Sequence, residues 1–419
     1  MRPVNTSARS GRISTATDMT VARLECSACG SQFSDRWRCT CGAPLDFAEQ
    51  RLPASPPSSV SNPPNNGLWA FDAFLPVGDD PADRVTLGEG MTPLVDPDPN
   101  PDSDLDSDPD PDPDTNPGTD ANPRSRRLDR TDRWHASFKL EYVSPTGSFK
   151  DRGATTVLTR ARELGVTQLV EDSSGNAGAA VATYAARAGI DARVFVPAAV
   201  KAGKLSGIRA AGADPVRVPG DRAAVTQACV DAVREGDSWY ASHAWNPAFF
   251  AGTATFAYEV AFQRGWTAPD AVVLPIGHGT LFLGAFRGFR VLKAAGWIDN
   301  VPRLLGAQAA GVAPIVEELH GPQAANPARE PNETADGIQI ADPVRKNQIL
   351  DAIDETDGDV IAISEADTTR ELERLHRAGF YTEPTCAVPP AALRKYYDRG
   401  VLDRDADVVV PLTGSGLKN

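Results

Sequence analysis

The chain has 419 residues, of which 41% are hydrophobic, so it is long enough for two or three domains with a sizeable core. Its formal net charge of −14 argues against nucleic acid as a partner, because a phosphate-binding surface needs an excess of basic residues. The chain contains no apolar run of 18 residues, and its first twenty residues lack the apolar core of a secretion signal. We therefore expect a cytoplasmic protein that does not span a membrane. Its acidic balance with few lysines is typical of halophilic proteins.

The composition changes several times within the first 130 residues. Residues 1–20 are polar and aperiodic, which predicts disorder, and residues 21–50 contain four of the six cysteines. Residues 51–66 form a Pro/Ser/Asn linker, and residues 67–95 return to an ordered pattern. Residues 96–130 are a low-complexity Pro/Asp tract, which predicts an extended, solvated insertion.

From Trp134 onward, short apolar runs alternate with amphipathic segments, which predicts alternating strands and helices. The expected buried strands are Gln168–Glu171, Ala192–Val196, Asp214–Val218, Ala271–Leu274, Arg303–Ala307, Val360–Ile363 and Asp407–Val410. The expected helices are Lys150–Leu164, Ala177–Ala188, Lys201–Ala211, Arg222–Glu235, Thr253–Gln263, Leu281–Ala295, Ala366–Arg377 and Pro390–Arg399. This alternation predicts an open α/β fold with parallel strands, in which ligands bind where strands lead into helices.

The first such loop is SPTGSFKDRG, residues 144–153, where a proline–glycine turn leads into a helix. Lys150 lies in the first turn of that helix, close to its positive terminus and to Arg152, and both would lower the pKa of its amine. A neutral amine is what Schiff-base formation requires. A single lysine at a helix start is more often a solvated residue, so this interpretation depends on the other loops.

Three further loops follow predicted strands. SSGNAG, starting at Ser173, places small residues, two hydroxyls and Asn176 at the beginning of a helix, where a carboxylate can bind. The glycine-rich turn at residues 275–281 can hold a phosphate through backbone N–H groups, and residues 412–418 offer hydroxyls to a ring nitrogen. Together the four loops supply the parts that a pyridoxal-phosphate site requires.

The motifs SPTGSFKDRG, SSGNAG, PIGHGT and PLTGSGLK, with GEGMTPL upstream and YTEPT before the last, resemble the fold-type II pyridoxal-phosphate enzymes, and threonine synthases in particular. The resemblance covers residues 87–94 and 134–419. It implies two open α/β domains behind an N-terminal cysteine-rich ribbon, and a homodimer. The catalytic region would comprise residues 67–95 and 131–419, with a small mobile domain at about residues 172–257 that closes on an amino-acid substrate.

The resemblance also implies roles for individual residues. Lys150 would hold pyridoxal 5′-phosphate and transfer protons at the substrate carbons. Asn176 would contact the phenolic oxygen of the cofactor, and Thr413 its ring nitrogen. The cofactor phosphate would be wrapped by five consecutive residues, Gly277, His278, Gly279, Thr280 and Leu281. The substrate carboxylate would lie beside Thr146, Ser173 and Ser174.

The cysteine cluster resembles the ribbon at the front of some threonine synthases. Its four members are Cys26, Cys29, Cys39 and Cys41. Four thiolates suit tetrahedral Zn²⁺, although the C-x-C pair is tighter than the usual C-x2-C. Two interpretations therefore stand, a structural zinc site or a ribbon that no longer holds metal.

The resemblance implies a lyase of threonine biosynthesis that converts O-phosphohomoserine into threonine and phosphate. One stretch departs from the family pattern NSxNPxRLEGQKT, which is expected to bind the substrate phosphate: Ala244, Phe249 and Ala254 stand at its serine, arginine and lysine positions. Each charge-assisted hydrogen bond is worth about 1.5–3 kcal/mol, so these replacements favour a less anionic substrate unless His243 and His278 compensate. The alternatives are a serine or threonine dehydratase or another β-eliminating or β-replacing enzyme, and a catalytically silent cofactor-binding protein.

Overall fold

The computed structural model describes residues 22–53, 55–56, 67–78, 80–97, 133–200, 202–236 and 238–418. The predictions for residues 1–20, for most of the 51–66 linker and for most of the 96–130 insertion lie outside these residues. Within the described part of the chain, no helix is long and apolar enough to cross a membrane.

The larger of the two α/β sheets has six strands, in the order β12-β11-β10-β13-β5-β4. Their bounds are Asp359–Ile363, Arg303–Ala309, Ala271–Pro275, Val408–Pro411, Ser137–Lys139 and Leu94–Val95, respectively. All neighbouring strands are parallel except β4, which is antiparallel to β5. Every residue of β10 is buried, as expected of a central parallel strand covered on both faces.

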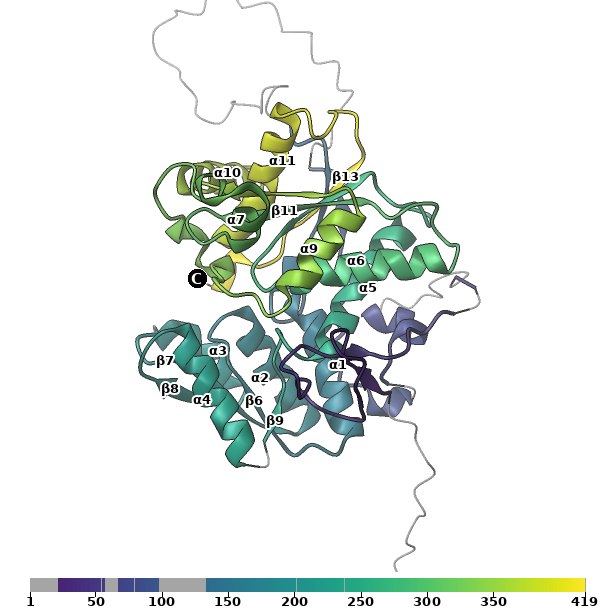
Figure 1. Cartoon of the computed structure of the whole chain (residues 1–419), viewed down its shortest axis with the longest axis vertical. Coiled ribbons are helices and arrows are strands. Elements are labelled where there is room, and N and C mark those ends of the chain that lie inside the picture. The colour runs from purple at the N-terminus through teal and green to yellow at the C-terminus, as the bar shows by residue number, and fades with distance from the viewer. Residues whose placement is uncertain are drawn as a thin grey trace, which may run out of the picture.

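Helices cover both faces of this sheet (Figure 1). They are α6 Thr280–Ala294, α7 Pro314–His320, α8 Pro322–Ala325, α9 Lys346–Glu355, α10 Glu365–Arg377 and α11 Val388–Asp398. Successive residues of β10 belong to different cores: Val272 packs with the α6 side chains and Val273 with those of α11. This alternation follows from the period of two in a strand.

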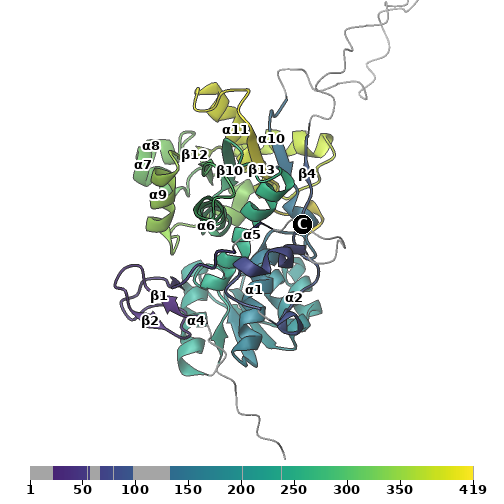
Figure 2. The ribbon, with the colours of Figure 1, turned by 90° about the vertical axis from the view of Figure 1, so that its right-hand side faces the viewer.

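The smaller sheet has four parallel strands in the order β8-β7-β6-β9. Their bounds are Asp214–Val218, Asp191–Pro197, Gln168–Glu171 and Trp239–Tyr240, respectively. The helices of this half are α1 Lys150–Glu163, α2 Asn176–Ala188, α3 Ser206–Ala210 and α4 Arg222–Glu235, and α5 Pro247–Gln263 packs on both α1 and α6. Figure 2 shows the two halves stacked, with α1 and α5 near their junction.

The structure confirms all seven strands that were predicted from the sequence. The predicted burial of β8, however, is wrong. This strand lies at the edge of its sheet and has no fully buried residue. Helix α5 begins six residues earlier than predicted, because Asn246 caps it and Pro247 occupies its first position. The helix expected at 201–211 is described from Ala202 as two short pieces, η5 Ala202–Leu205 and α3.

Other elements were not predicted. They are the short strands β4, β5 and β9, the helices α7 to α9, and the 3-10 helices η1 Gly67–Phe74, η2 Pro81–Asp83, η4 Glu141–Val143, η6 Glu333–Ile338, η7 Pro384–Ala387 and η8 Gly416–Lys418.

The cysteine-rich ribbon is a separate three-stranded antiparallel sheet of β1 Leu24–Glu25, β2 Gln32–Phe33 and β3 Asp46–Phe47. It contacts both halves of the molecule. The Trp37 ring packs edge-on against Tyr240 and Trp245, at centroid distances of 5.4 and 5.2 Å. On the other side, the guanidinium of Arg345, the residue before α9, donates to Asp46 Oδ1 at 2.9 Å.

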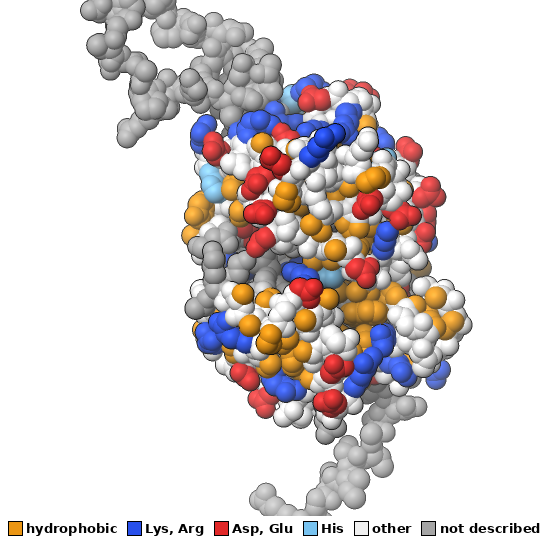
Figure 3. Space-filling view, turned by 60° about the vertical axis from the view of Figure 1, so that its left-hand side comes forward, with side chains coloured by type: hydrophobic (Ala, Val, Ile, Leu, Met, Phe, Trp, Pro, Cys, Tyr) orange, Lys and Arg blue, Asp and Glu red, His pale blue; other side chains and the backbone are white. Residues whose placement is uncertain are grey.

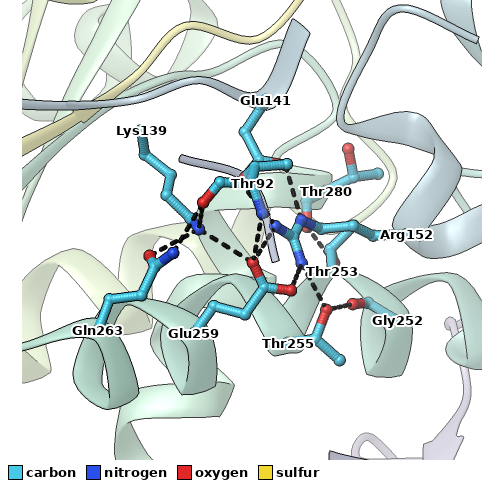
Figure 4. Close-up of polar contacts among 10 residues, drawn as sticks. All are labelled: Thr92, Lys139, Glu141, Arg152, Gly252, Thr253, Thr255, Glu259, Gln263 and Thr280. Carbon is cyan, nitrogen blue, oxygen red and sulfur yellow. Dashed lines mark hydrogen bonds and ion pairs between the residues drawn. The ribbon is translucent and has the colours of Figure 1, made fainter. Parts of the chain in front are cut away.

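A fully buried cluster of ion pairs lies beneath the start of α1 (Figure 4). The Arg152 guanidinium contacts Glu141 of η4 and Glu259 of α5, in each case at 2.6 Å. Lys139 of β5 lies 2.9 Å from Glu259, and Thr92 donates to Glu141 at 2.8 Å. All four charged side chains have no exposed surface, so this cluster fixes α1 against the edge of the large sheet and against α5.

We predict that Glu259→Gln lowers the free energy of unfolding by about 3–5 kcal/mol, because it leaves Lys139 without a buried counter-charge and Arg152 with Glu141 alone. Urea unfolding at neutral pH measures the loss. Glu355→Gln, which removes an exposed carboxylate 3.5 Å from Arg290, is the control and should cost less than about 1 kcal/mol. Equal losses in the two variants would contradict the assignment.

The same cluster predicts a pH dependence. Burial alone would raise the pKa of Glu259, but the charges of Arg152 and Lys139 outweigh it and hold that pKa at about 2. The folded-state pKa is lowered from the ordinary value of about 4.3, so the stabilisation is present above that value and is lost as the pH falls toward 2. In Glu259→Gln this part of the acid destabilisation should be absent.

Candidate active site

A cavity of about 580 Å³ opens at the carboxyl ends of β6, β10 and β13. Its wall contains all eleven residues that the sequence predicted to contact cofactor or substrate: Thr146, Lys150, Ser173, Ser174, Asn176, Gly277, His278, Gly279, Thr280, Leu281 and Thr413. Figure 3 shows the boundary between the two halves of the molecule, where acidic, basic and histidine side chains gather. The strand–helix loops therefore converge on one place, as expected for open α/β sheets.

Lys150, the first residue of α1, points its amine at Thr280 and donates to the hydroxyl at 3.1 Å. The amine also lies 4.4 Å from the centre of the Phe149 ring. Burial lowers the pKa of Lys150 to about 8, and the charge of Arg222 contributes in the same direction. A neutral amine is therefore accessible near neutral pH, as a Schiff base requires.

From the sequence, we expected the positive end of the helix and Arg152 to lower this pKa, and the expectation for Arg152 is wrong. Arg152 belongs to the buried ion-pair cluster, where its charge is matched by Glu141 and Glu259. Arg222, at the first position of α4, is the guanidinium that acts on Lys150, and it lines the cavity. Arg222 was not predicted to belong to the site, because two strands and two α-helices separate α4 along the chain from the loop that follows β6.

The glycine-rich loop between β10 and α6 has the shape of a phosphate cradle. Gly279, the residue before α6, has a φ of 74° and makes no side-chain cap. A Cβ at Gly279 would lie 2.5 Å from Ile349, and one at Gly277 would lie 3.3 Å from Ile338. The uncapped N–H groups at the start of α6 can therefore approach an anion closely, and the loop fits the phosphate of pyridoxal phosphate.

Asn176, the first residue of α2, is held by two residues that the sequence did not assign to the site. Its amide nitrogen donates to both carboxyl oxygens of Glu383, at 3.0 and 2.9 Å, and its oxygen accepts from Lys418 at 3.0 Å. Burial raises the pKa of Glu383. Both residues stand in quoted motifs, YTEPT and PLTGSGLK, so the signal that could have found them was present.

Thr413 and Thr146 occupy the positions that the sequence predicted, each with a neighbour. The Thr413 hydroxyl is buried and lies 3.4 Å from the Cys386 sulfur. The backbone N–H of Thr146 donates to Asp151 at 2.7 Å, and its hydroxyl contacts the same carboxyl group. Burial raises the pKa of Asp151 to about 7. A substrate carboxylate at Thr146 would therefore compete with Asp151, whereas Ser173 and Ser174 lie at the cavity wall.

Most of the stretch that was compared with NSxNPxRLEGQKT lies outside the cavity wall. Only His243 of this stretch lines the cavity. Ala244, Phe249 and Ala254 are buried in the protein core, with the Phe249 ring filling the space that a side chain at Gly153 would need. The Phe249 ring nevertheless lies next to the site, with its centre 5.9 Å from the Lys150 amine and 6.1 Å from the centre of the His243 ring. The inference of a less anionic substrate stays a prediction.

The four ribbon cysteines come together as the spacing predicted. Their sulfur atoms all lie within 4.8 Å of one another, with Cys26 3.6 Å from Cys41 and Cys29 3.4 Å from Cys39. This group could hold a metal ion. None of the four lines the cavity, so a metal there would have a structural role.

A lysine amine of lowered pKa, a glycine cradle for phosphate and a cavity between two α/β sheets together define a pyridoxal-phosphate site. Comparison with known families agrees: residues 123–414 match the family described as pyridoxal-phosphate dependent enzymes, and the chain belongs to that family.

Curated relatives are named threonine synthase. The protein from Methanocaldococcus jannaschii is 32% identical over 356 residues, covering 84% of this chain and 81% of that protein. The one from Mycobacterium tuberculosis strain H37Rv is 30% identical over 370 residues, covering 87% of this chain and 91% of that protein. The chain is a pyridoxal-phosphate enzyme of the threonine synthase and dehydratase type.

Solved structures share the fold. The threonine deaminase from T.th. is 26% identical with a TM-score of 0.55, covering 67% of this chain and 87% of that chain. The serine racemase from Dictyostelium discoideum, 22% identical with a TM-score of 0.55, covers 67% of this chain and 86% of that chain and supports the fold alone.

We predict that Lys150→Ala abolishes both the visible absorbance of the Schiff base and the activity of the protein loaded with pyridoxal phosphate, because no other amine is expected to replace it. Lys346→Ala is the matched control. Lys346 also begins a helix, but it is partly exposed and pairs with Glu318 at 2.8 Å. An absorbance band that survives in Lys150→Ala would show that another amine holds the cofactor.

Proposed function

We propose that the protein is a threonine synthase that converts O-phosphohomoserine into threonine and phosphate. The observation that carries this proposal is the cavity itself, which joins the Lys150 amine and the glycine cradle to Arg222 and Lys418 in one wall. The Arg222 guanidinium suits a substrate with its own phosphate group, whereas the Lys418 amine donates to the Asn176 oxygen at 3.0 Å. The names of relatives that are 30–33% identical over most of the chain support the same conclusion.

When bound, pyridoxal phosphate supplies an electron sink next to the substrate α-carbon. The chain's own residues would do the rest. Lys150 holds the cofactor and then takes and returns protons at the α- and β-carbons. The backbone N–H groups of residues 277–281 hold the cofactor phosphate. Asn176, whose amide contacts Glu383 and Lys418 in the structure, would contact the phenolic oxygen of the bound cofactor.

Thr413, which lines the cavity, would face the ring nitrogen of the bound cofactor and would set how strongly the ring withdraws electrons. A neutral hydroxyl beside the ring nitrogen leaves that nitrogen less protonated than a carboxylate would. Weaker electron withdrawal suits elimination and replacement, which need no long-lived carbanion. Ser173 and Ser174, in the loop before α2, would orient the substrate carboxylate at the helix start.

Arg222 is our candidate for the substrate phosphate. It lines the cavity from the start of α4 and is exposed to solvent there, so an entering anion can reach it.

We predict that purified wild type releases phosphate and forms threonine, and that Arg222→Gln raises KM for O-phosphohomoserine about 10- to 100-fold. This range corresponds to one charge-assisted hydrogen bond of about 1.5–3 kcal/mol. Arg290→Gln, on the exposed face of α6, is the control.

The second candidate is a serine or threonine dehydratase, which the similarity to threonine deaminase favours. The same assay separates the two. Formation of a 2-oxo acid and ammonia from serine or threonine, without phosphate release from O-phosphohomoserine, would contradict threonine synthase and establish the dehydratase. In that case the Arg222→Gln substitution should leave KM for serine unchanged, since serine carries no phosphate.

For the ribbon we propose a structural Zn²⁺ bound by its four cysteines. Elemental analysis should find about one zinc per chain, because the four sulfur atoms already lie close enough for one tetrahedral ion. Cys41→Ser should lose the metal and lower the melting temperature. Thr40→Ala, an exposed change between two of the cysteines, should keep both. Protein that folds normally and contains no zinc would contradict the proposal.

A further inference from the structure

A histidine and a glutamate meet at the cavity wall, and the mechanism above uses neither. Glu171 is the last residue of β6, and His243 follows β9 by three residues. Because β6 and β9 are adjacent and parallel, their carboxyl ends lie at the same edge of the small sheet. His243 Nδ1 lies 2.6 Å from Glu171 Oε1, a short hydrogen bond between two buried side chains.

The two side chains lie at different depths from the cavity. His243 lines it, whereas Glu171 has no exposed surface and stands behind the ring. The other ring nitrogen, Nε2, has no hydrogen-bond partner among the described residues. The His278 ring, also in the wall, lies edge-on at a centroid distance of 5.1 Å. The geometry is that of an imidazole oriented by a carboxyl group, with one nitrogen left for a ligand.

The surroundings favour an uncharged His243 ring and an uncharged Glu171 carboxyl group. Burial lowers the pKa of His243 well below its ordinary value, and the charges of Lys150, His278 and Arg222 act in the same direction. Burial raises the pKa of Glu171 well above its ordinary value, and the charge of Asp172 adds to the effect; this outweighs the charge of Lys150 and the hydrogen bonds from the backbone N–H groups of His243 and Asp172, which lower that pKa. Glu171 Oε2 also has no partner in the described residues, which would be costly for a carboxylate. In that uncharged state a protonated Glu171 would donate to Nδ1, and Nε2 would carry the ring proton.

We propose that His243, oriented by Glu171, is a second proton-transfer residue of the reaction, acting at the substrate's leaving oxygen while Lys150 acts at its carbons. This inference rests on the proposed function only in requiring a substrate with an oxygen leaving group. As the carbon–oxygen bond breaks, its electron pair leaves with the oxygen, which takes the proton from Nε2. The Glu171 proton moves to Nδ1, so the ring stays neutral and Glu171 becomes a carboxylate.

The second half of the reaction restores the pair. Water adds to the substrate carbon through its oxygen and gives one proton to Nε2, while the Nδ1 proton returns to Glu171. One proton is thus given and one taken back in each turnover. For elimination without water addition, the proton that Lys150 removes from the α-carbon would have to return to the pair through solvent.

The kinetic test compares His243→Asn and Glu171→Gln with wild type. Asparagine can still contact Glu171 but cannot transfer a proton. We expect kcat of His243→Asn to fall about 10²- to 10⁴-fold, the usual contribution of a general acid, with KM and the cofactor absorbance little changed. The matched control is His320→Asn, which removes the exposed histidine whose Nε2 lies 2.7 Å from Asp359 and which lies outside the cavity.

A second readout separates chemistry from a merely structural role. In D2O, His243→Asn should still exchange the substrate α-proton, because Lys150 performs that step, and NMR follows the exchange directly. In the cofactor-free protein, ¹⁵N NMR should show His243 as the neutral Nε2–H form even at about pH 5, below the ordinary imidazole value of about 6.5. The resonance is assigned by its absence from His243→Asn.

Three results would overturn the inference: a kcat for His243→Asn within about threefold of wild type, loss of α-proton exchange together with turnover, or a His243 ring charged at neutral pH. Failure of the proposed function is distinct, because it shows in wild type as absent phosphate release. The comparison is then repeated with L-serine, whose hydroxyl is the leaving group, and unchanged ammonia release in His243→Asn would overturn the inference on that substrate as well.

Discussion

The active-site helix is held by ion pairs that water does not reach. Arg152 lies between two carboxylates, and Lys139 shares one of them, in a place with no exposed surface. Removing such charges from water costs several kcal/mol per ion, so the arrangement is favourable only because nearly every donor finds an acceptor. Thr92, Thr255 and Gln263 supply the remaining contacts. The cluster therefore fixes the position of the first turn of α1. Lys150 belongs to that turn and lies two residues before Arg152.

That position explains the chemistry of Lys150 better than its sequence neighbours do. The charge of Arg152 is matched by Glu141 and Glu259, so it does not set the pKa of the amine. Burial does so instead, with Arg222 contributing from the small half. Lys346 makes the contrast clear, since it also begins a helix but remains at the surface beside Glu318. Its location in the fold, rather than its place in a helix, distinguishes Lys150, the lysine that we propose holds the cofactor.

Sequence patterns predicted the features of the fold that depend on neighbouring residues along the chain. Short apolar runs indicated the central strands, and the glycines at 277 and 279 indicated the candidate phosphate loop. The structure leaves no room for a Cβ at Gly279, which would lie 2.5 Å from Ile349, and little room at Gly277. Strands of two or three residues, such as β5 and β9, carry too little periodicity to be recognised. The predicted burial of β8 was wrong because an apolar run does not reveal which strand lies at a sheet edge.

The features that the sequence missed in the site depend on long-range contacts. Asn176 meets Glu383 across 207 residues, and Glu171 meets His243 across 72. Neither partner follows from spacing, because each pairing requires knowing which loops share a cavity. The packing of Phe249 was not predictable for a related reason: its position in a motif did not reveal that its ring would pack against Gly153. Residue types can be read from the chain, but only the packing decides which of them face a ligand.

The ribbon connects these observations, because it contacts the segment that carries His243. Trp37 packs against Tyr240, the last residue of β9, and against Trp245, two residues after His243. The Arg345 guanidinium donates both to the Leu45 carbonyl and to the Trp245 carbonyl, at 2.8 and 2.9 Å. The His243 segment is therefore fixed on one side by the ribbon and on the other by Glu171. Because Arg345 precedes α9 of the larger half, a displacement of the small sheet that carries His243 with it would have to break the contact between Arg345 and Trp245. The ribbon and Arg345 therefore hold the proposed proton-transfer pair in place relative to the larger half.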